Sequence, residues 1–452
     1  MHRDHSPQVV ASALKDPEFV RQLQRLRQPD NFTNIYYLAR AWIYLGLVIG
    51  ATIWFYQFRQ GADISFLWNV PVTLLAVVLV GAGQHQLTGL AHEASHHTLF
   101  KNHKLNELVS DLLCMYPLFS TTHQYRLQHL AHHQFVNDPR RDPDLAQMQR
   151  SGHLLDFPVS KAEFIKTLLG QIFLPRLVRY MRIRAAYSAV GTGRGPYRRT
   201  GASESKVPLL AAVIYLVVLV VLLVSLEIIG NRLMMAVIPA IWCVAMLVFY
   251  ALLPSSHWVQ PRLLHPISPR IGSMLRLGYI SGLFAALTWA TLLSGTWVAV
   301  HFILLWIVPA FTSFSFFMVL RQLVQHGNCD RAALTNTRVF MMSPLVTFSV
   351  FPIGQDYHLP HHLFATVPHF RLKSLHELLL AYPDYREEAM VVDGYFRPRQ
   401  HPPTHPTVLE VLGPEYARSS DDVYIDETVL GTGSVEQKEE IRQEEQLSRL
   451  QE

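Results

Sequence analysis

The chain has 452 residues, of which 50% are hydrophobic and only 16% are charged, and its formal net charge is +5. An ordinary soluble domain has about 25% charged residues, so this balance favours a protein embedded in a membrane. Because the Lys and Arg residues lie next to the apolar blocks, where they set orientation and contact lipid headgroups, the positive charge does not indicate a nucleic-acid partner.

The start of the chain predicts a cytoplasmic segment, 1–35, followed by a membrane hairpin, 36–90. The first segment is polar, carries an amphipathic stretch from Ala11 to Arg27 and shows no signal-peptide pattern. Two apolar blocks follow, Tyr36–Phe58 and Phe66 to about Leu90, separated by a short polar turn. Each block is long enough to cross a bilayer, so the chain is expected to return to its starting side.

Residues 91–206 predict a cytoplasmic region, because they lack a clean apolar block and are rich in Arg and Lys. Within this region, Phe164–Tyr187 mixes apolar residues with regularly spaced Arg. That pattern predicts one helix lying on the lipid headgroups. Residues 191–205 are expected to form a loop.

Residues 207–325 predict the remaining membrane helices. The loop 254–276 is basic, whereas the turns 230–232 and 294–296 carry almost no charge, which places the loop in the cytoplasm and the turns on the other side. One block is short, so either four or six crossings in total fit this arrangement. The four apolar blocks are Leu209–Ile229, Leu233–Leu253, Leu277–Leu293 and Trp297–Leu320.

The last part of the chain predicts a second cytoplasmic region, 326–415, and a charged tail, 416–452. The apolar run Val339–Ile353 is short and interrupted by proline, so it is expected to be interfacial or buried and not a crossing. Arg371–Tyr385 predicts an amphipathic helix. The tail has little to bury, which favours disorder or an exposed helix.

Three histidine clusters lie on the predicted cytoplasmic side. The first is His92-Glu93-Ala94-Ser95-His96-His97, in which His92 and His96 are one helical turn apart. The second and third share one pattern, a His, two spacers and an adjacent pair. Imidazoles on one face of a helix can reach the same metal ion. Eight ligands are therefore predicted: His92, His96, His129, His132, His133, His358, His361 and His362.

The number of histidines predicts two metal ions with four or five ligands each, since one ion cannot use them all. The three cysteines are widely separated and form no CxxC, so a thiolate site is not expected. Imidazole suits Zn, Cu, Fe or Ni, and ligand type does not choose among them. A site where apolar spans meet the cytoplasm suits oxidation of lipid C–H bonds, which favours iron and O2.

Other polar residues near the clusters are assigned supporting roles. A metal-bound His usually donates its second N–H to a carboxylate or carbonyl, so the nearby carboxylates are expected to orient the ligands. The segments around Asp138 and Asp142 also fit plain turns. The isolated histidines His85, His97, His123 and His301 are expected to be hydrogen-bonded polar residues outside the ligand set. The carboxylates in question are Glu93, Asp138, Asp142, Asp144 and Asp356.

These motifs resemble the three histidine boxes of the integral-membrane fatty acid desaturase superfamily, which includes related hydroxylases. The resemblance covers roughly residues 36–380. Outside the boxes it is carried by the following residues: Tyr125-Arg126, Asn137-Asp138, Asp142-Pro143-Asp144, Arg321, His326-Gly327, Thr335 to Arg338, Pro368 and Leu375-His376.

The resemblance implies an all-α membrane protein with four to six transmembrane helices and a cytoplasmic helical cap that carries the histidine boxes. It implies two iron ions, O2 as oxidant, and an acyl-lipid, acyl-CoA or acyl-carrier substrate in an apolar tunnel. It also implies that His326 is a ninth ligand, although Gln325 stands where the family usually has Glu. The haem motif His-Pro-Gly-Gly does not occur, so electrons are expected from a separate cytochrome b5 or ferredoxin.

The resulting hypothesis is an O2-dependent acyl desaturase that introduces a C=C double bond. A hydroxylase of the same superfamily is the nearest alternative, because placement of the substrate decides between the two outcomes. A zinc-dependent lipid hydrolase or a metal transporter is more remote. Transporters place ionisable residues within their spans, whereas these clusters gather at one face.

Overall fold

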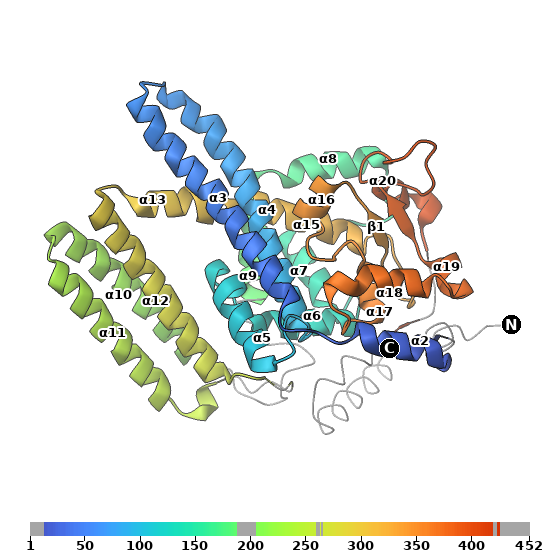
Figure 1. Ribbon diagram of the computed structural model, residues 1–452, viewed down its shortest axis with the longest axis horizontal. Helices are drawn as coiled ribbons and strands as arrows, with labels where there is room; N and C mark the ends of the chain where they lie inside the picture. Colours follow the sequence, from blue (N-terminus) through green and yellow to red (C-terminus); the bar gives the residue numbers. More distant parts are fainter. Residues whose placement is uncertain (1–12, 188–204, 259–262, 264, 419–422, 425–452) are drawn as a thin grey trace.

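The computed structural model describes residues 13–187, 205–258, 263, 265–418 and 423–424. Helices dominate these residues, and six helical segments are long and apolar enough to cross a membrane, which favours six crossings over four. In Figure 1 the α3–α4 hairpin and the α10–α11–α12 group project from a body of shorter helices, and the last segment, Val298–Gln325, runs from the second group into this body. The six segments are Thr33–Gly61, Phe66–Ser95, Val207–Ile229, Arg232–Leu252, Pro269–Ser294 and Val298–Gln325.

The first hairpin consists of α3 (Thr33–Gly61) and α4 (Asn69–Ser95), which is preceded by the short turn η1 (Phe66–Trp68). Helix α4 runs further than its predicted apolar block, so its last turn lies inside the body. A side chain at Gly81 would place its Cβ 2.6 Å from the backbone nitrogen of Phe314. Only glycine therefore permits the close approach of α4 to the last span.

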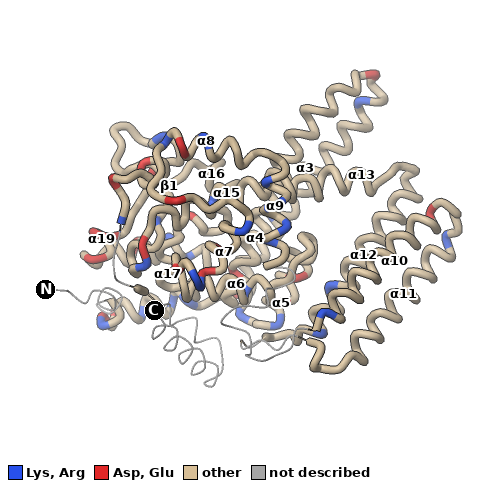
Figure 2. The backbone as a smooth tube through the Cα atoms, turned by 180° about the vertical axis from the view of Figure 1, so that it is seen from behind, with Lys and Arg blue, Asp and Glu red and all other residues tan. Residues whose placement is uncertain are grey.

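The second group consists of α10 (Val207–Ile229), α11 (Arg232–Leu252) and α12 (Pro269–Ser294). The predicted short block is part of a 26-residue helix, because α12 begins at a proline whose preceding Ser268 caps the helix. Figure 2 shows charged residues at the ends of these helices and almost none along them. Large apolar side chains on their outer faces are exposed, as expected of lipid-facing helices.

The last span is interrupted. It is built from α13 (Val298–Phe302), the π-helical turn η6 (Ile303–Ile307), α14 (Val308–Phe311) and α15 (Ser313–Gln325). Pro309 lies in the first turn of α14, where a proline ring is tolerated, and this agrees with a new helical segment beginning at Val308. The Trp306 side chain donates to the carbonyl of Pro117 at 2.8 Å, which ties the interrupted region to the body.

The helix predicted over Phe164–Tyr187 is wrong in its extent. The structure divides it into α8 (Lys161–Gln171) and α9 (Leu174–Ala185), and a proline at the start of α9 explains the break. The other elements between the second and third spans are α5 (His103–Ser110), η2 (Asp111–Met115), η3 (Tyr116–Leu118), α6 (Thr122–Gln134) and α7 (Pro143–Ser151).

The region after the last span contains a two-stranded parallel sheet that the sequence did not predict. Strand β1 (Val339–Met341) pairs with β2 (Val391–Asp393), and Phe340 lies opposite Val392. Strand β1 and α16 (Pro344–Ser349) account for the apolar run predicted as interfacial or buried. The following elements are α17 (His358–Leu363), η7 (His369–Arg371), α18 (Leu372–Leu379), α19 (Pro383–Glu388), α20 (Val408–Val411) and η8 (Pro414–Tyr416).

Two predicted elements of the terminal regions take a different form. The amphipathic helix predicted over Arg371–Tyr385 ends at Leu379, and a separate helix, α19, begins at Pro383. The N-terminal stretch forms α2 (Pro17–Leu26), whose buried side chains pack near the third histidine cluster. The loop 191–205, apart from its last residue, and most of the tail 416–452 lie outside the described residues.

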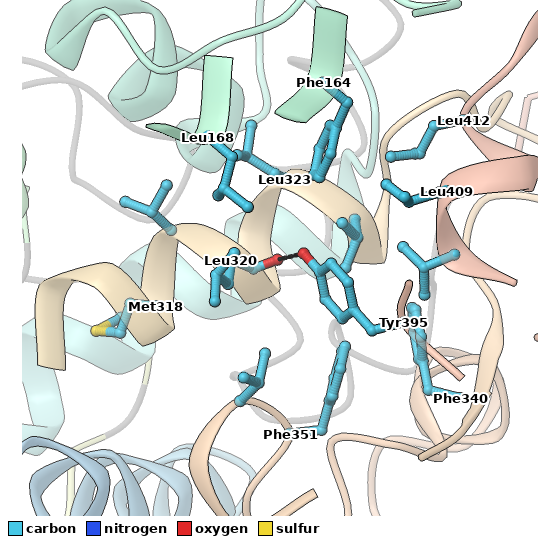
Figure 3. Packing of buried hydrophobic residues seen from close by; sticks show 14 of the residues in the cluster. Phe164, Leu168, Met318, Leu320, Leu323, Phe340, Phe351, Tyr395, Leu409 and Leu412 are labelled. Atoms are coloured by element: carbon cyan, nitrogen blue, oxygen red, sulfur yellow. Dashed lines mark hydrogen bonds between the residues drawn. The ribbon is translucent and has the colours of Figure 1, made fainter. Parts of the chain in front are cut away.

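A hydrophobic core joins the last span to the C-terminal region (Figure 3). The Tyr395 hydroxyl donates to the carbonyl of Leu320 at 3.1 Å, and the rings of Phe340 and Phe351 stack with centroids 4.5 Å apart. Burial of this apolar surface fixes α15 against the sheet. The end of α15, where His326 follows, is positioned by this packing.

Candidate metal centre

All nine predicted histidines come together in two groups, within each of which the ligand nitrogens lie within 4.8 Å of one another. We call them the five-histidine group and the four-histidine group. The first contains His92, His96, His129, His133 and His361, and the second contains His132, His326, His358 and His362.

The nitrogens of the five-histidine group have the spacing of ligands on one ion. The Nε2 atom of His129 lies 2.9 Å from that of His96 and 3.1 Å from that of His133. The Nε2 atoms of His133 and His361 are 3.0 Å apart. Both ring nitrogens of His92 are buried without a hydrogen-bond partner among the described residues. Two nitrogens at right angles, each about 2.1 Å from an ion, would lie about 3 Å apart, so a metal ion fits this group.

The four-histidine group has the same geometry. The Nε2 atom of His326 lies 3.2 Å from that of His132 and 3.0 Å from that of His358. The Nε2 atoms of His358 and His362 are 3.2 Å apart. The other ring nitrogen of His326 contacts the carbonyl of Asn336 at 2.9 Å, which turns Nε2 toward the group.

Short helices present most of these side chains. Helix α6 carries His129, His132 and His133, and α17 carries His358, His361 and His362. In both helices a His is followed by two other residues and then by an adjacent His pair, and this spacing places the three rings on one helical face. Figure 1 shows α6 and α17 near the inner end of α4. His92 is in the last turn of α4, whereas His96, predicted to be on the helix, is the residue that caps it.

A buried arginine holds the end of α4 in place. The Arg126 guanidinium donates to the carbonyls of Ala94 and Ser95 at 2.8 and 2.9 Å, and to the carboxylate of Glu107 at 2.6 Å. The last carbonyls of a helix have no partner within it, so this contact satisfies them. It also fixes the segment between His92 and His96.

A second buried arginine does the same for the last span. Arg338 donates to the carbonyl of Val324 and to the carbonyl of Gly327, both at 2.6 Å. These carbonyls flank His326, and Thr337 donates to the carbonyl of Gln325 at 2.7 Å. The residues directly before β1 therefore hold the end of α15, and they set the position of the predicted ninth ligand.

Of the carboxylates predicted to orient the ligands, Asp142 makes the direct contact. Its oxygens lie 3.0 and 3.1 Å from Nδ1 of His132. Asp142 also caps α7. The sequence left open whether Asp142 orients a ligand or forms a turn, and in the structure it does both. Glu93 is 3.4 Å from Nδ1 of His92, but it also accepts from the backbone of His369 at 2.8 Å.

Asp138 and Asp144 make different contacts, and no side-chain contact between Asp356 and a histidine is seen among the described residues. Asp138 pairs with Arg331 at 2.7 Å and with Arg141 at 2.8 Å, and so fits the turn interpretation. Asp144 accepts from the side-chain amide of Gln322 at 3.3 Å. Neither of these two residues makes a hydrogen bond to a described histidine of the two groups, so their direct contacts do not show the predicted orienting role.

Burial controls the protonation of the histidines. It lowers the pKa of His96, His129 and His133 well below the ordinary value, so these imidazoles are neutral and their lone pairs can bind a cation. Burial, the largest single effect, lowers the pKa of His132, but the charges of Asp142 and Asp144 and the hydrogen bond with Asp142 together outweigh it and raise this pKa to about 9. A metal ion bound to His132 would therefore displace a proton.

The four isolated histidines lie outside both groups. His85 contacts the carbonyl of Ser349 at 2.7 Å, and His97 stacks on His103 with ring centroids 4.4 Å apart. The ring centroid of His123 lies 5.6 Å from that of His265. The ring centroid of His301 lies 5.9 Å from that of Tyr56. Their positions outside both groups agree with the prediction, but of the four only His85 shows the predicted hydrogen bond, and both ring nitrogens of His123 are buried without a partner among the described residues.

A small cavity, which we call the polar chamber, borders both histidine groups. Its volume is about 30 Å³. Arg184, Gln147, Gln322 and Gln355 line it but were not singled out from the sequence. Arg184 belonged to a pattern typical of a surface helix, and only the packing of α9 reveals that it faces inward. The lining residues are His92, Tyr125, Gln128, His129, His132, Asp144, Gln147, Arg184, Tyr187, Arg321, Gln322, Gln325, Gln355 and His358.

A larger cavity, which we call the apolar cavity, adjoins the polar chamber. Its volume is about 150 Å³, and Tyr125 and Arg184 line both spaces. The ring of Tyr125 also stacks on that of His129, with centroids 5.4 Å apart. An alkyl chain in the apolar cavity would therefore lead toward the histidines. Its other lining residues come from α4, η2, η3, α9 and the interrupted last span, and include Ala91, Met115, Leu118, Met181, Trp306, Ala310 and Phe314.

Comparison with known proteins connects this geometry to a family. Residues 67–262 and 259–393 match the model of the family described as fatty acid desaturase. A dihydrorhizobitoxine desaturase from Bradyrhizobium elkanii is 37% identical over 136 residues, which are 30% of this chain and 35% of that protein. The match to this relative therefore covers about a third of its length and about a third of the present chain.

Proposed function

The chain belongs to the fatty acid desaturase family, and on this premise we propose that it is a membrane oxidoreductase that introduces a C=C double bond into an acyl substrate with O2 as oxidant. The observation that carries the proposal is the pair of histidine groups bordering a polar chamber that adjoins an apolar cavity. We assign one iron ion to the five-histidine group and one to the four-histidine group. Nine imidazoles suit iron, and family membership favours it over zinc.

The proposed reaction balances with two external electrons. A saturated pair of methylene carbons, O2, two electrons and two protons give an alkene and two molecules of water. When bound, the two iron ions would supply O2 activation and the oxidising power to remove hydrogen from C–H bonds. The protein holds the ions, places the carbons and limits the access of water.

The chain's own residues account for the placement. The apolar cavity would take the alkyl chain by hydrophobic burial, and Tyr125 would guide it past His129, on which it stacks. Asp142 holds His132 in one orientation, and Arg126 and Arg338 hold the segments that carry His92 and His326. This support keeps the ligands within the narrow tolerance that catalysis needs.

The proposal also covers the carrier of the acyl chain, the electron donor and the side of the membrane on which the metal site lies. An acyl-lipid, acyl-CoA or acyl-carrier substrate would present its chain to the apolar cavity. We assign the electrons to a separate cytochrome b5 or ferredoxin, which membership of the desaturase family supports. The basic loops on the histidine side of the six apolar segments support a cytoplasmic site.

The test is a reconstituted reaction. Membranes that contain the chain receive a saturated acyl substrate, a reductase and either cytochrome b5 or ferredoxin, in air or under argon. We expect an unsaturated product only in air and only with the native chain. The matched control, His362→Ala, removes one ligand of the four-histidine group and should give no product. Unsaturated product under argon, or from His362→Ala at the native rate, would contradict the proposal.

A further inference from the structure

The polar chamber contains a positive charge that the described residues do not neutralise by direct contact. Arg321, on α15, is only 7% exposed and lines the chamber. Its Nε atom is buried without a hydrogen-bond partner, and no described residue makes a hydrogen bond or ion pair with its guanidinium. A buried charge without a partner is costly, so this guanidinium is poised to receive an anion.

A second donor in the chamber also lacks a partner. Gln147, on α7, is 3% exposed, and its Nε2 atom has no hydrogen bond to any described residue. The same chamber is lined by Arg184 and by one carboxylate, Asp144, which accepts from Gln322. The charge of Arg321 is the one without a direct hydrogen-bond or ion-pair partner among the described residues. A ligand with a single negative charge and oxygen acceptors would complement both the charge and the free donor.

The size of the chamber selects among anions. A buried water needs at least about 10–15 Å³, so a volume of about 30 Å³ has room for roughly two atoms of oxygen size. This is the size of a carboxylate group. A phosphodiester headgroup or a nucleotide is too large. The guanidinium fork also matches the two oxygens of a carboxylate.

The position of the chamber relates the anion to the reacting carbons. His92 and His129 of the five-histidine group and His132 and His358 of the four-histidine group line the chamber, and Tyr125 and Arg184 connect it to the apolar cavity. A molecule with its carboxylate at Arg321 and its chain in the apolar cavity would pass the histidines within a few bonds of the carboxylate.

We infer that the substrate is a free carboxylic acid, whose carboxylate binds Arg321 and Gln147 while its apolar part occupies the apolar cavity. This inference rests on the proposed function: it keeps the reaction and replaces the acyl-lipid, acyl-CoA or acyl-carrier substrate by the free acid. An ester or thioester of an acyl chain has no negative charge at that carbonyl and leaves Arg321 without a partner. The oxidised carbons are those close to the carboxylate, and not carbons in the middle of a long chain.

Binding measurements test the inference without turnover. Decanoate, methyl decanoate and decyl phosphate are titrated into the detergent-purified, iron-loaded chain by calorimetry. We expect decanoate to bind at least about tenfold more tightly than its methyl ester, as a charge-assisted hydrogen bond predicts. Arg321→Gln should remove this preference, and Arg321→Lys should retain part of it. Arg270→Gln is the matched control, because Arg270 lies on α12 and binds backbone carbonyls outside the chamber.

The outcomes separate this inference from the proposed function. Equal binding of acid and ester, tighter binding of decyl phosphate, or unchanged decanoate binding in Arg321→Gln would overturn the inference even if desaturation of an ester is observed. Arg321-dependent binding of decanoate supports the inference even if the reconstituted reaction fails. If Arg321→Gln does not retain iron, Gln147→Leu takes its place, and native decanoate affinity in that variant overturns the inference.

Discussion

Arg126 and Glu107 form an ion pair of 2.6 Å in which the two side chains are only 1% and 2% exposed. The pair joins α6 to α5, and through the carbonyls of Ala94 and Ser95 it also holds the end of α4. Three helices that frame the histidines therefore meet at one guanidinium. Removal of either partner would leave a charge buried without compensation.

Arg126→Ala is expected to lower the free energy of unfolding by about 3–5 kcal/mol, because the Glu107 carboxylate is left buried and unpaired. The iron content should fall as well, since His92 and His96 lose their support. The matched control is Arg21→Ala, which breaks an ion pair whose side chains are 63% and 54% exposed. Arg21→Ala should lower the free energy of unfolding by less than about 1 kcal/mol. Thermal unfolding in detergent and metal analysis provide the measurements, and equal stability of the two variants would contradict this role.

Adjacent histidines on α17 belong to different groups, so they separate the two proposed metal sites. His361→Ala should deplete the ion of the five-histidine group, and His362→Ala that of the four-histidine group. Each variant should lose turnover and retain about one iron in place of about two. His97→Ala is the control, because His97 follows the ligand His96 but lies outside both groups. Full iron content in His361→Ala or His362→Ala would remove that residue from the ligand set.

Asp142→Asn tests the orientation of a ligand. The amide keeps an oxygen for the cap of α7 but loses the negative charge beside Nδ1 of His132. Loss of such a partner typically reduces metal affinity or activity about 10–100-fold, and we expect a decrease in this range. Iron retention under a graded chelator is the readout. Ser160→Ala, which removes the cap of α8, should retain iron like the native chain, and an equal loss in both variants would show a purely structural effect.

The sequence predicts the histidines of the three clusters well, because the spacing that identifies them lies within a few residues of one helix. One-two-pair spacing on a helix determines which rings share a face, and the structure gathers all nine residues; that they bind iron remains a prediction. Only the resemblance predicts that His326 is a ligand, because a single histidine after a membrane span has no local pattern.

The support of the site could not be predicted in the same way. Arg126 contacts Glu107 on another helix, and Arg338 contacts the end of α15 across a loop. Neither contact joins residues at a regular spacing in the sequence, so neither gives a periodic pattern. The pairing of β1 with β2 joins segments about 50 residues apart, and short strands of this kind give a weak signal. Arg184 was assigned to a surface because inward and outward arginines on an amphipathic helix look alike in sequence.

Cysteine labelling from each side of the membrane tests the proposed orientation of the chain. Single cysteines at Lys101 and Lys373, in a background without the native cysteines, should react with an impermeant reagent from the cytoplasmic side. Cysteines at Ala62 and Arg232 should react only from the opposite side. All four positions are exposed in the structure. Cytoplasmic labelling at Arg232 would show that α10 and α11 do not cross, whereas external labelling at Lys101 would reverse the proposed sidedness.

The mass of the product formed under ¹⁸O₂ tests the central claim most directly. A saturated substrate, deuterated at the carbons next to its carboxyl carbon and along its chain, is converted by the iron-loaded chain with its electron donor. The account predicts a product that has lost two hydrogen isotopes from adjacent carbons and contains no ¹⁸O, with the label recovered in water. Incorporation of ¹⁸O into the product would assign the site to hydroxylation, and cleavage of the substrate without O2 would contradict redox chemistry at the histidine groups altogether.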